Sequence, residues 1–295
     1  MIRERHGGVL DFNAVKSDRP IAVAIPLAHE AGQRLTDPFF SEMITHLADE
    51  ITRRGYAMFL RTALPPLGDW LGRLIKEQAP AAVIVIGQST VDITLDAVAS
   101  FYHPMVVWGG DLGSSYCTVG TDNVAGAVLA VEHLLSIGRR RIIFLGDPIA
   151  PEVRLRLEGY HTALERAGIA ALEHIPTHLM EESAEETMRA VLSAHGRFDA
   201  IFAASDVIAI GAARAVLAAG MRVPEDVAIV GFDDIARAVH ATPQITTVRQ
   251  NLAQGAHLLV ELACRRGDGE DTPSTFMVPE LIVRESTVGS RPPGL

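Results

Sequence analysis

The sequence has 295 residues, a formal net charge of −10 at pH 7, 48% hydrophobic residues and 21% charged residues. This length accommodates two globular domains with buried cores, and no stretch approaches the roughly 18 uncharged apolar residues that a membrane helix requires. The acidic balance argues against a nucleic-acid-binding surface, because neutralising phosphates requires clustered lysine and arginine. We therefore expect a soluble protein with no membrane partner.

Seven short apolar runs, which we predict to be strands, recur along the chain with amphipathic segments between them. They cover residues 20–27, 56–63, 81–87, 104–110, 141–147, 199–206 and 227–234. Continuous apolar strands that alternate with helices are typical of parallel sheets covered on both faces. In the segment after the first run, Phe40, Met43, Leu47 and Ile51 recur at helical spacing. The predicted fold class is therefore α/β.

The strand and helix units group into two successive sets, roughly 20–120 and 121–245, and each set has the size of a single domain. A further helix and a last extended stretch, FMVPELIVREST, follow the second set. We predict two doubly wound parallel-sheet subdomains.

The N-terminal residues and the cysteines indicate the cellular compartment of the protein. Residues 1–19 are polar and lack the apolar core of a secretory signal, so we interpret them as a leader or a linker remnant. A mature chain whose signal has been removed is the alternative. Cys117 and Cys264 lie far apart and match no metal-ligand spacing, as is typical of two reduced thiols. We expect a cytoplasmic protein without a bound metal.

Parallel α/β sheets bind ligands at the carboxyl ends of their strands, in the crevice at a topological switch point. The residues that directly follow the predicted strands are therefore the candidate ligand contacts. They are Asp37 to Phe40, Gln88, Ser89, Trp108 to Asp111, Ser205, Asp206, Asp233 and Asp234.

Motifs for catalysis are missing from the sequence. It contains no Gly-x-Ser-x-Gly elbow, no phosphate-binding loop ending in Gly-Lys-Ser/Thr, no His-Glu-x-x-His and no glycine-rich dinucleotide fingerprint. We predict that the chain is not an enzyme and has neither catalytic residues nor a cofactor. The competing hypothesis is an enzyme that uses Asp233 or Asp206 as an acid or base.

Two pairs of polar residues follow predicted strands. Asp233 and Asp234 are adjacent, so in an extended chain their side chains point to opposite faces, which suits neither a shared proton nor a metal. We assign Asp233 to the ligand, against a turn or helix-cap role. Ser205 and Asp206 open a helix, so Ser205 is a ligand contact or an N-cap, and the cap is favoured for Asp206.

Aromatic rings and one arginine complete the candidate site. Phe39 and Phe40 begin the first helix, where one ring packs in the core and an aromatic face suits a sugar or a base. Trp108 is either a second stacking wall or a core residue. Arg156 is either solvated or grips two vicinal hydroxyls or a carboxylate with its planar guanidinium.

The chain resembles the effector-binding core of the lactose-repressor (LacI) family of transcription regulators from about Pro20 to Thr287. The motifs that carry this resemblance are TDNVAGAVLAVEHLLSIGRRRIIFLGD, RLRLEGYHTAL, ASDVIAIGAARAVLAAGMRVPEDVAIVGFDDI, TPQITTVRQ and PELIVREST. The family pattern has leucine where this chain has Ile245. Several long motifs in the same order make the resemblance specific.

The resemblance implies the type I periplasmic-binding-protein fold, in which a three-stranded hinge joins the subdomains near residues 120, 250 and 278. The implied N-terminal subdomain is 20–120 plus 252–277, and the implied C-terminal subdomain is 121–251 plus 278–290. Asp233 and Arg156 are implied as polar clamps on the effector. Ser205, Phe39 and Phe40 are implied to line the cleft, with Gln250 near a crossover. Asp234 is implied to begin the connection back to the first subdomain.

The resemblance also implies a function. We expect the sensing core of a regulator that binds a small polar effector, a sugar or sugar derivative, forms a homodimer and reaches operator DNA only through a helix-turn-helix domain. This sequence shows no such domain before its first strand, which is expected of either a truncated chain or a natural protein that has lost it. The alternative is a sugar-binding protein of ABC transport with the same fold.

Overall fold

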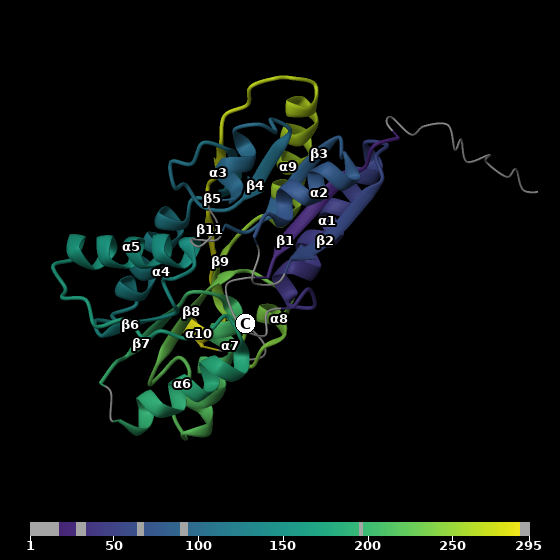
Figure 1. Ribbon diagram of the computed structural model, residues 1–295. Coiled ribbons are helices and arrows are strands. Elements are labelled where there is room, and N and C mark those ends of the chain that lie inside the picture. Colours follow the sequence, from purple (N-terminus) through teal and green to yellow (C-terminus); the bar gives the residue numbers. More distant parts are fainter. Residues whose placement is uncertain (1–17, 28–33, 64–67, 89–93, 195–196, 290–295) are drawn as a thin grey trace, which may run out of the picture.

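The computed structural model describes residues 18–27, 34–63, 68–88, 94–194 and 197–289, which form two lobes (Figure 1). Each lobe is built on one β-sheet with helices on both faces, so the predicted α/β class is confirmed. Most of the predicted leader and the candidate contact Ser89 lie outside the described residues.

The first sheet has six strands in the order β10-β5-β4-β3-β1-β2, and all of its pairings are parallel. Its strands are β1 (Ile21–Pro26), β2 (Met58–Ala63), β3 (Ala82–Ile86), β4 (Met105–Trp108), β5 (Cys117–Thr121) and β10 (Thr275–Met277). Alternate residues of the central strand β1 enter different cores. Ile21, Val23 and Ile25 pack towards α1 and α9, whereas Ala22 and Ala24 pack towards α2.

The second sheet has five strands in the order β11-β9-β8-β7-β6. They are β6 (Ile142–Leu145), β7 (Ala200–Ala203), β8 (Ala228–Asp233), β9 (Thr246–Arg249) and β11 (Glu280–Ile282). Only the edge strand β11 runs antiparallel to its neighbour among the described pairings. All seven apolar runs read from the sequence contain a strand of one of the two sheets.

Helices cover both faces of each sheet. In the first lobe these are α1 (Pro38–Arg53), α2 (Trp70–Gln78), α3 (Thr94–Ala99) and α9 (Leu252–Gly267). In the second lobe they are α4 (Asn123–Ser136), α5 (Pro151–Arg166), α6 (Glu181–Ser193), α7 (Asp206–Ala218), α8 (Ala236–His240) and α10 (Glu285–Val288). α4 packs on α5 and α6 packs on α7, around one apolar core.

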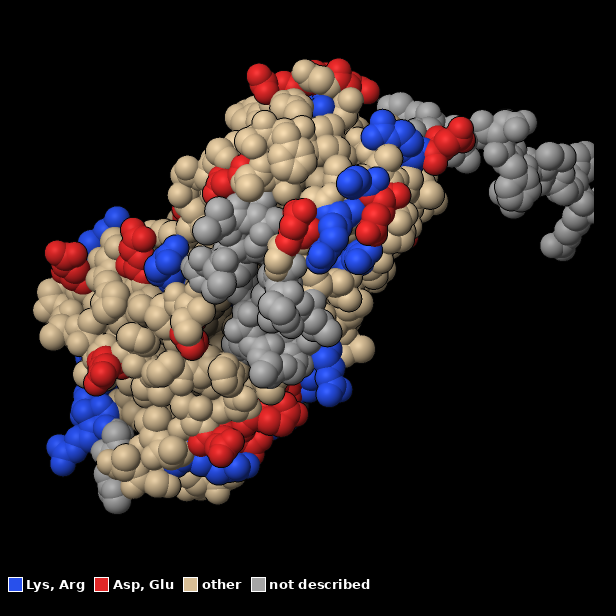
Figure 2. Space-filling view, in the orientation of Figure 1, with Lys and Arg blue, Asp and Glu red and all other residues tan. Residues whose placement is uncertain are grey.

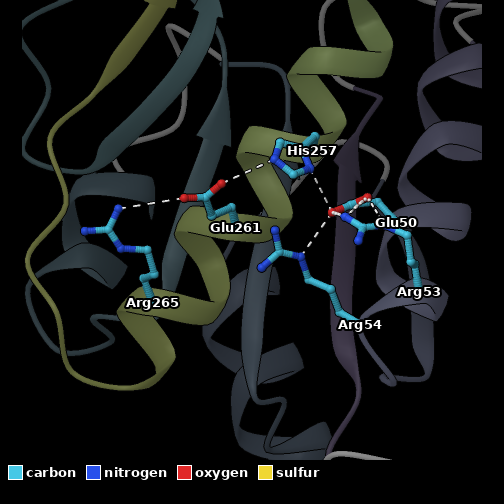
Figure 3. A network of polar contacts seen from close by, with 6 residues as sticks. All are labelled: Glu50, Arg53, Arg54, His257, Glu261 and Arg265. Atoms are coloured by element: carbon cyan, nitrogen blue, oxygen red, sulfur yellow. Dashed lines mark hydrogen bonds and ion pairs between the residues drawn. The ribbon is translucent and has the colours of Figure 1, made fainter.

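A surface network holds α1 against α9, although the two helices lie about two hundred residues apart in the sequence (Figure 3). The His257 ring of α9 lies 3.0 Å from the Glu50 carboxylate of α1 and 3.3 Å from that of Glu261. Arg53 and Arg54 also contact Glu50. α9 follows the second lobe in the sequence but packs in the first lobe. This contact and the apolar packing beneath it hold α9 there.

The chain passes between the two sheets three times, after β5, after β9 and between β10 and β11. The stretch Phe276–Thr287, predicted as one extended segment, therefore divides between two sheets and ends in α10. The first and third passages are joined because the Asp122 backbone N–H donates to the Met277 carbonyl at 3.0 Å.

An acidic residue joins the second-lobe segments that border the later two passages. The Asp234 carboxylate, 7% exposed, lies 2.7 Å from Arg249 at the end of β9 and 2.5 Å from Arg284 beyond β11. Arg249 also contacts Glu280 of β11 at 3.0 Å. From Asp234 the chain first forms α8 and β9 within the second lobe, and it returns to the first lobe only after Gln250.

Charges of both signs intermix on the face of the molecule that Figure 2 shows. Lysine and arginine side chains lie there beside aspartate and glutamate. Ion pairs such as Arg222–Asp226 and Arg265–Glu270, each at 2.9 Å, follow the same pattern. Arginines that are already paired with carboxylates are poor counterions for a phosphate backbone.

Candidate functional site

A cavity of about 570 Å³ lies between the two lobes, at the carboxyl ends of the strands. This volume is within the range of small-molecule sites in proteins. All seven residues predicted to bind a ligand line it, namely Phe39, Phe40, Trp108, Arg156, Ser205, Asp233 and Gln250. The structure therefore brings the predicted set together, and ligand contact by each residue stays a prediction.

The centre of the cavity's polar wall is the ion pair between Arg156 and Asp233. Arg156 lies on α5, which begins with Pro151, and the guanidinium Nη1 is 3.4 Å from the Asp233 carboxylate. Both side chains are buried, with 6% and 11% exposed. Since a buried charge requires partners, the pair must be supported from behind.

Arg156 has that support. Its Nε donates to Asn123 Oδ1 at 2.8 Å, and its Nη1 donates to the Ala204 carbonyl at 2.5 Å. The guanidinium also lies 3.8 Å from the centre of the Phe232 ring. Burial lowers the pKa of Arg156, and the Asp233 charge opposes this shift. The side chain is thus held in one orientation before any ligand arrives.

The DN-x-x-G motif, Asp122 to Gly126, explains how the start of α4 supports Arg156. Asp122 caps this helix by accepting a hydrogen bond from the Ala125 backbone N–H at 2.9 Å. Capping leaves Asn123 at the first helical position, where its Nδ2 donates to the Thr121 carbonyl and its Oδ1 receives Arg156. The motif requires glycine at position 126, because a Cβ there would lie 2.9 Å from the Phe232 ring that underlies Arg156.

Asp233 is the last residue of β8, with a φ of 114°. Gln250 Nε2 donates to Asp233 Oδ1 at 2.7 Å, and the Gln250 backbone N–H donates to the Asp233 carbonyl at 3.2 Å. Burial raises the pKa of Asp233 to about 6, although Arg156 and Gln250 lower it. The second carboxylate oxygen makes no hydrogen bond within the described part of the chain, so it is available to a ligand.

The two adjacent acids have separate roles, as their side chains point apart. Asp233 lines the cavity, whereas Asp234 is absent from its lining and pairs with Arg249 at the end of β9 and with Arg284 beyond β11. A positive φ at both residues, 114° and 61°, produces this divergence.

Ser205 and Asp206 open α7 together. Ser205 lines the cavity and is also the N-cap, accepting a hydrogen bond from the Ile208 N–H at 3.4 Å. Asp206 is fully buried beneath the cavity floor, and its Oδ2 accepts a hydrogen bond from the Ile235 N–H at 2.9 Å. Burial raises the pKa of Asp206 well above its usual range, and the Asp233 charge adds to the rise. Asp206 is therefore a structural residue behind the site, and the cap role favoured for it from the sequence is wrong, because Ser205 is the N-cap.

The opposite wall is aromatic. Phe39 lies edge-on to Phe40, with ring centres 5.7 Å apart, and is 6.3 Å from the Trp108 ring. Phe40 and Trp108 are almost fully buried in the first lobe's core, whereas Phe39 is only partly buried. A Cβ at Gly255 of α9 would lie 2.4 Å from Trp108, so this ring packs tightly from behind. Phe39 therefore offers the largest free aromatic surface.

Six of the candidate contacts within the described residues do not line the cavity, namely Gln88, Gly109, Gly110, Asp111, Asp206 and Asp234. Gln88 is buried, and it bonds the Tyr116 hydroxyl and the Gly110 N–H instead of lining the cavity. Sequence reasoning missed Glu152, Glu181 and Arg237, which all line it. Glu152 lies four residues before Arg156, so their helical spacing was the one available signal.

Other kinds of site find no support in the described ranges. No group of three or more His, Cys, Asp and Glu side chains that could hold a metal ion occurs there. Within those same ranges, every helix is too short or too polar to cross a bilayer.

The fold and the cavity define the class of protein. Residues 131–287 match the model of a periplasmic binding protein-like domain. The HTH-type transcriptional repressor PurR of Haemophilus influenzae is 31% identical over 266 residues, covering 84% of this chain and 77% of that protein. This chain belongs to the LacI family of transcriptional regulators, as its motifs predict.

Two solved structures are similar along most of the chain. One is a complex of the transcriptional regulator CelR with cellobiose, with 31% identity, a TM-score of 0.80 and coverage of 91% of this chain and 85% of that chain. The other is a LacI transcriptional regulator from a Rhodococcus species, with 26% identity, a TM-score of 0.78 and coverage of 90% and 98%. The predicted two-lobed fold is confirmed at this level.

Proposed function

We propose that this chain is the effector-sensing and dimerisation core of its regulator, and that a small polar ligand, a sugar, binds in the cavity between the sheets. Binding closes a first subdomain of 20–120 plus 252–277 on a second of 121–251 plus 278–290. The closure then changes the affinity of helix-turn-helix DNA-binding modules for their operator, because a ligand shifts a population by its differential affinity for two states.

The observation that carries this proposal is the buried Arg156–Asp233 pair facing an aromatic wall. The pair offers N–H donors and a carboxylate acceptor side by side, which suits neighbouring hydroxyl groups. The Phe39 ring opposite suits the apolar CH face of a sugar ring. A related regulator, CelR, has been solved with cellobiose, which supports a sugar as the ligand class.

Regulation is favoured over transport and catalysis. The relatives above are named transcriptional regulators, so the alternative of an ABC-transport sugar-binding protein is not favoured. They also support the absence of enzymatic turnover. The core would reach DNA only through the helix-turn-helix, because its own charge balance is acidic.

A homodimer is part of the proposal, because operator half-sites are usually read by two-fold symmetric proteins. Leu217 of α7 and Val239 of α8 leave 41% and 38% of their surface exposed, and the two helices are in contact. Exposed apolar side chains of this kind on the second lobe are available for association of two copies. Sedimentation analysis would test it, and a monomer at micromolar concentration would contradict it.

The experiment that tests the function is a thermal-shift screen against neutral sugars, sugar acids, sugar phosphates, nucleosides and purines, with mass spectrometry of each compound afterwards. We expect a hit that raises the melting temperature with concentration and is recovered unchanged. A hit that is consumed would make the protein an enzyme. Stabilisation that survives Asp233→Asn together with Arg156→Met would place the ligand elsewhere.

A further inference from the structure

The charges that line the cavity are unbalanced. Five carboxylates and three arginines line it, namely Asp37, Glu152, Glu181, Glu182 and Asp233 against Arg34, Arg156 and Arg237. An excess of carboxylates creates a negative potential in a partly enclosed site, where the field is screened less than at an open surface.

Two of the arginines are already neutralised by carboxylates of the same wall. Arg156 pairs with Asp233 and is held by Asn123 and the Ala204 carbonyl. Arg237 of α8 forms a two-bond pair with Glu181, at 2.6 and 2.9 Å. An anionic ligand would have to displace a buried carboxylate from either arginine, which leaves that carboxylate without its partner.

Arg237 is also restrained from behind. The Glu181 side chain is only 6% exposed, and it binds Arg214 of α7 at 2.9 Å in addition to Arg237. These contacts join the first turn of α6 to α7 and α8. The Glu181 cluster is therefore a structural part of the cavity wall, in which two arginines share one carboxylate.

Glu152, like Asp37 and Glu182, forms no ion pair within the described residues, and of these three carboxylates it is the one on the helix of Arg156. It lies in the first turn of α5, one helical turn before Arg156, and faces the same cavity. No arginine, lysine or histidine within the described residues lies within ion-pair distance of its carboxylate. The Glu152 charge acts on the Arg156–Asp233 pair. Burial raises the pKa of Asp233 most, and the Glu152 charge raises it further, by less than burial does.

We propose that the cavity selects a ligand that carries no negative charge, and that Glu152 is the residue that sets this specificity. This inference rests on the proposed function, which it narrows to neutral or amine-bearing polyols and away from sugar acids and sugar phosphates. The neutral Arg156–Asp233 pair recognises hydroxyl groups, while the Glu152 carboxylate repels an acidic substituent.

The test compares matched forms of the same sugar. Dissociation constants are measured at low ionic strength for the neutral sugar, its uronic or aldonic acid and its phosphate, starting with cellobiose, glucose and ribose. We expect the neutral form of a scaffold that binds to be at least about tenfold tighter than its acid, because like charges in a partly buried site repel. An acid or phosphate that binds more tightly than its neutral form would overturn the proposal.

A variant then tests the residue. Glu152→Gln keeps the shape and removes the charge, so the ratio of acid to neutral dissociation constants should fall by about tenfold. Glu158→Gln is the matched control, because Glu158 is exposed on the same helix and does not line the cavity. If Glu152→Gln and Glu158→Gln leave the same ratio, Glu152 does not set the specificity.

A further assay distinguishes failure of this inference from failure of the proposed sensing function. A small-molecule extract of bacterial cells, separated by ion exchange into anionic, cationic and neutral fractions, is added to the protein in the thermal-shift assay. Stabilisation by the neutral or cationic fraction supports the proposal, and stabilisation by the anionic fraction alone overturns it while leaving a ligand sensor. If no fraction and no pure sugar stabilises the protein, the sensing function itself is wrong and this inference falls with it.

Discussion

The first-lobe wall of the cavity presents the aromatic rings of Phe39 and Trp108, whereas the second-lobe wall presents the polar side chains of Arg156 and Asp233. The aromatic rings are held by apolar packing alone. The polar groups are held by directional bonds from α4, β8 and the residue after β9. In the proposed function, the second lobe would therefore fix the orientation of a ligand, and the first lobe would supply surface that covers it.

The largest expected effect comes from removing the arginine that anchors the polar wall. Arg156→Ala should destabilise the protein by about 3 kcal/mol or more, because it leaves Asp233, Asn123 and the Ala204 carbonyl without their buried partner. Arg154→Ala is the control, since Arg154 is exposed on the same helix. Chemical denaturation would measure both, and equal stability of the two variants would contradict a structural role of the pair.

Next in size is the loss of the carboxylate itself. Asp233→Asn should weaken binding of a neutral sugar at least tenfold, because a charge-assisted hydrogen bond is worth roughly 1.5 to 3 kcal/mol. Asparagine is preferable to alanine here, because it tolerates the positive φ of this position better. Calorimetric titration would measure the affinity, and an unchanged value would remove Asp233 from the site.

Acidification should produce an effect of similar direction. Because burial raises the pKa of Asp233 to about 6, its carboxylate is roughly one-tenth ionised at pH 5. Affinity for a neutral sugar should therefore fall by about tenfold between pH 7.5 and pH 5. Titrations of Asp233→Asn at the same pH values give the control, and an equal fall in that variant would assign the effect to another group.

The ligand-free protein should respond to pH in the opposite sense. A carboxyl group whose folded pKa lies above its unfolded value contributes stability that is fully present below the unfolded pKa. For Asp233 this contribution is lost as the pH rises through about 6. The pKa of Asp206 is shifted in the same direction, mainly by burial. The melting temperature of Asp233→Asn should therefore rise relative to that of the unchanged protein between about pH 4 and pH 6, and the difference should stay constant at higher pH.

The smallest effect sharpens the contrast within the aromatic wall. Phe39→Leu should weaken sugar binding by a few fold, since an aromatic contact is worth roughly 0.5 to 1.5 kcal/mol. Phe40→Leu should lower the melting temperature more and the affinity less, because its ring is buried in the first-lobe core. A larger loss of affinity from Phe40→Leu would reverse their assignment.

The sequence was informative wherever local pattern decides structure. Apolar runs predicted the strands, and the rule for carboxyl ends of parallel strands brought Trp108, Ser205 and Asp233 to one cavity. The division of the last segment was not predictable in that way, because β10 and β11 have three residues each and pair with different sheets. The Glu181–Arg237 pair likewise depends on tertiary contact between α6 and α8.

The cross-links between the passages have a kinematic consequence. Asp122 is bonded to Met277 beside the first and third passages, and Arg249 is paired with Glu280 beside the second and third. Three independent linkers would allow the lobes to twist, slide and bend separately, but linkers tied to one another must move in concert. We therefore expect the relative motion of the lobes to be confined near a single rotation axis, so that a ligand in the cavity would select one angle.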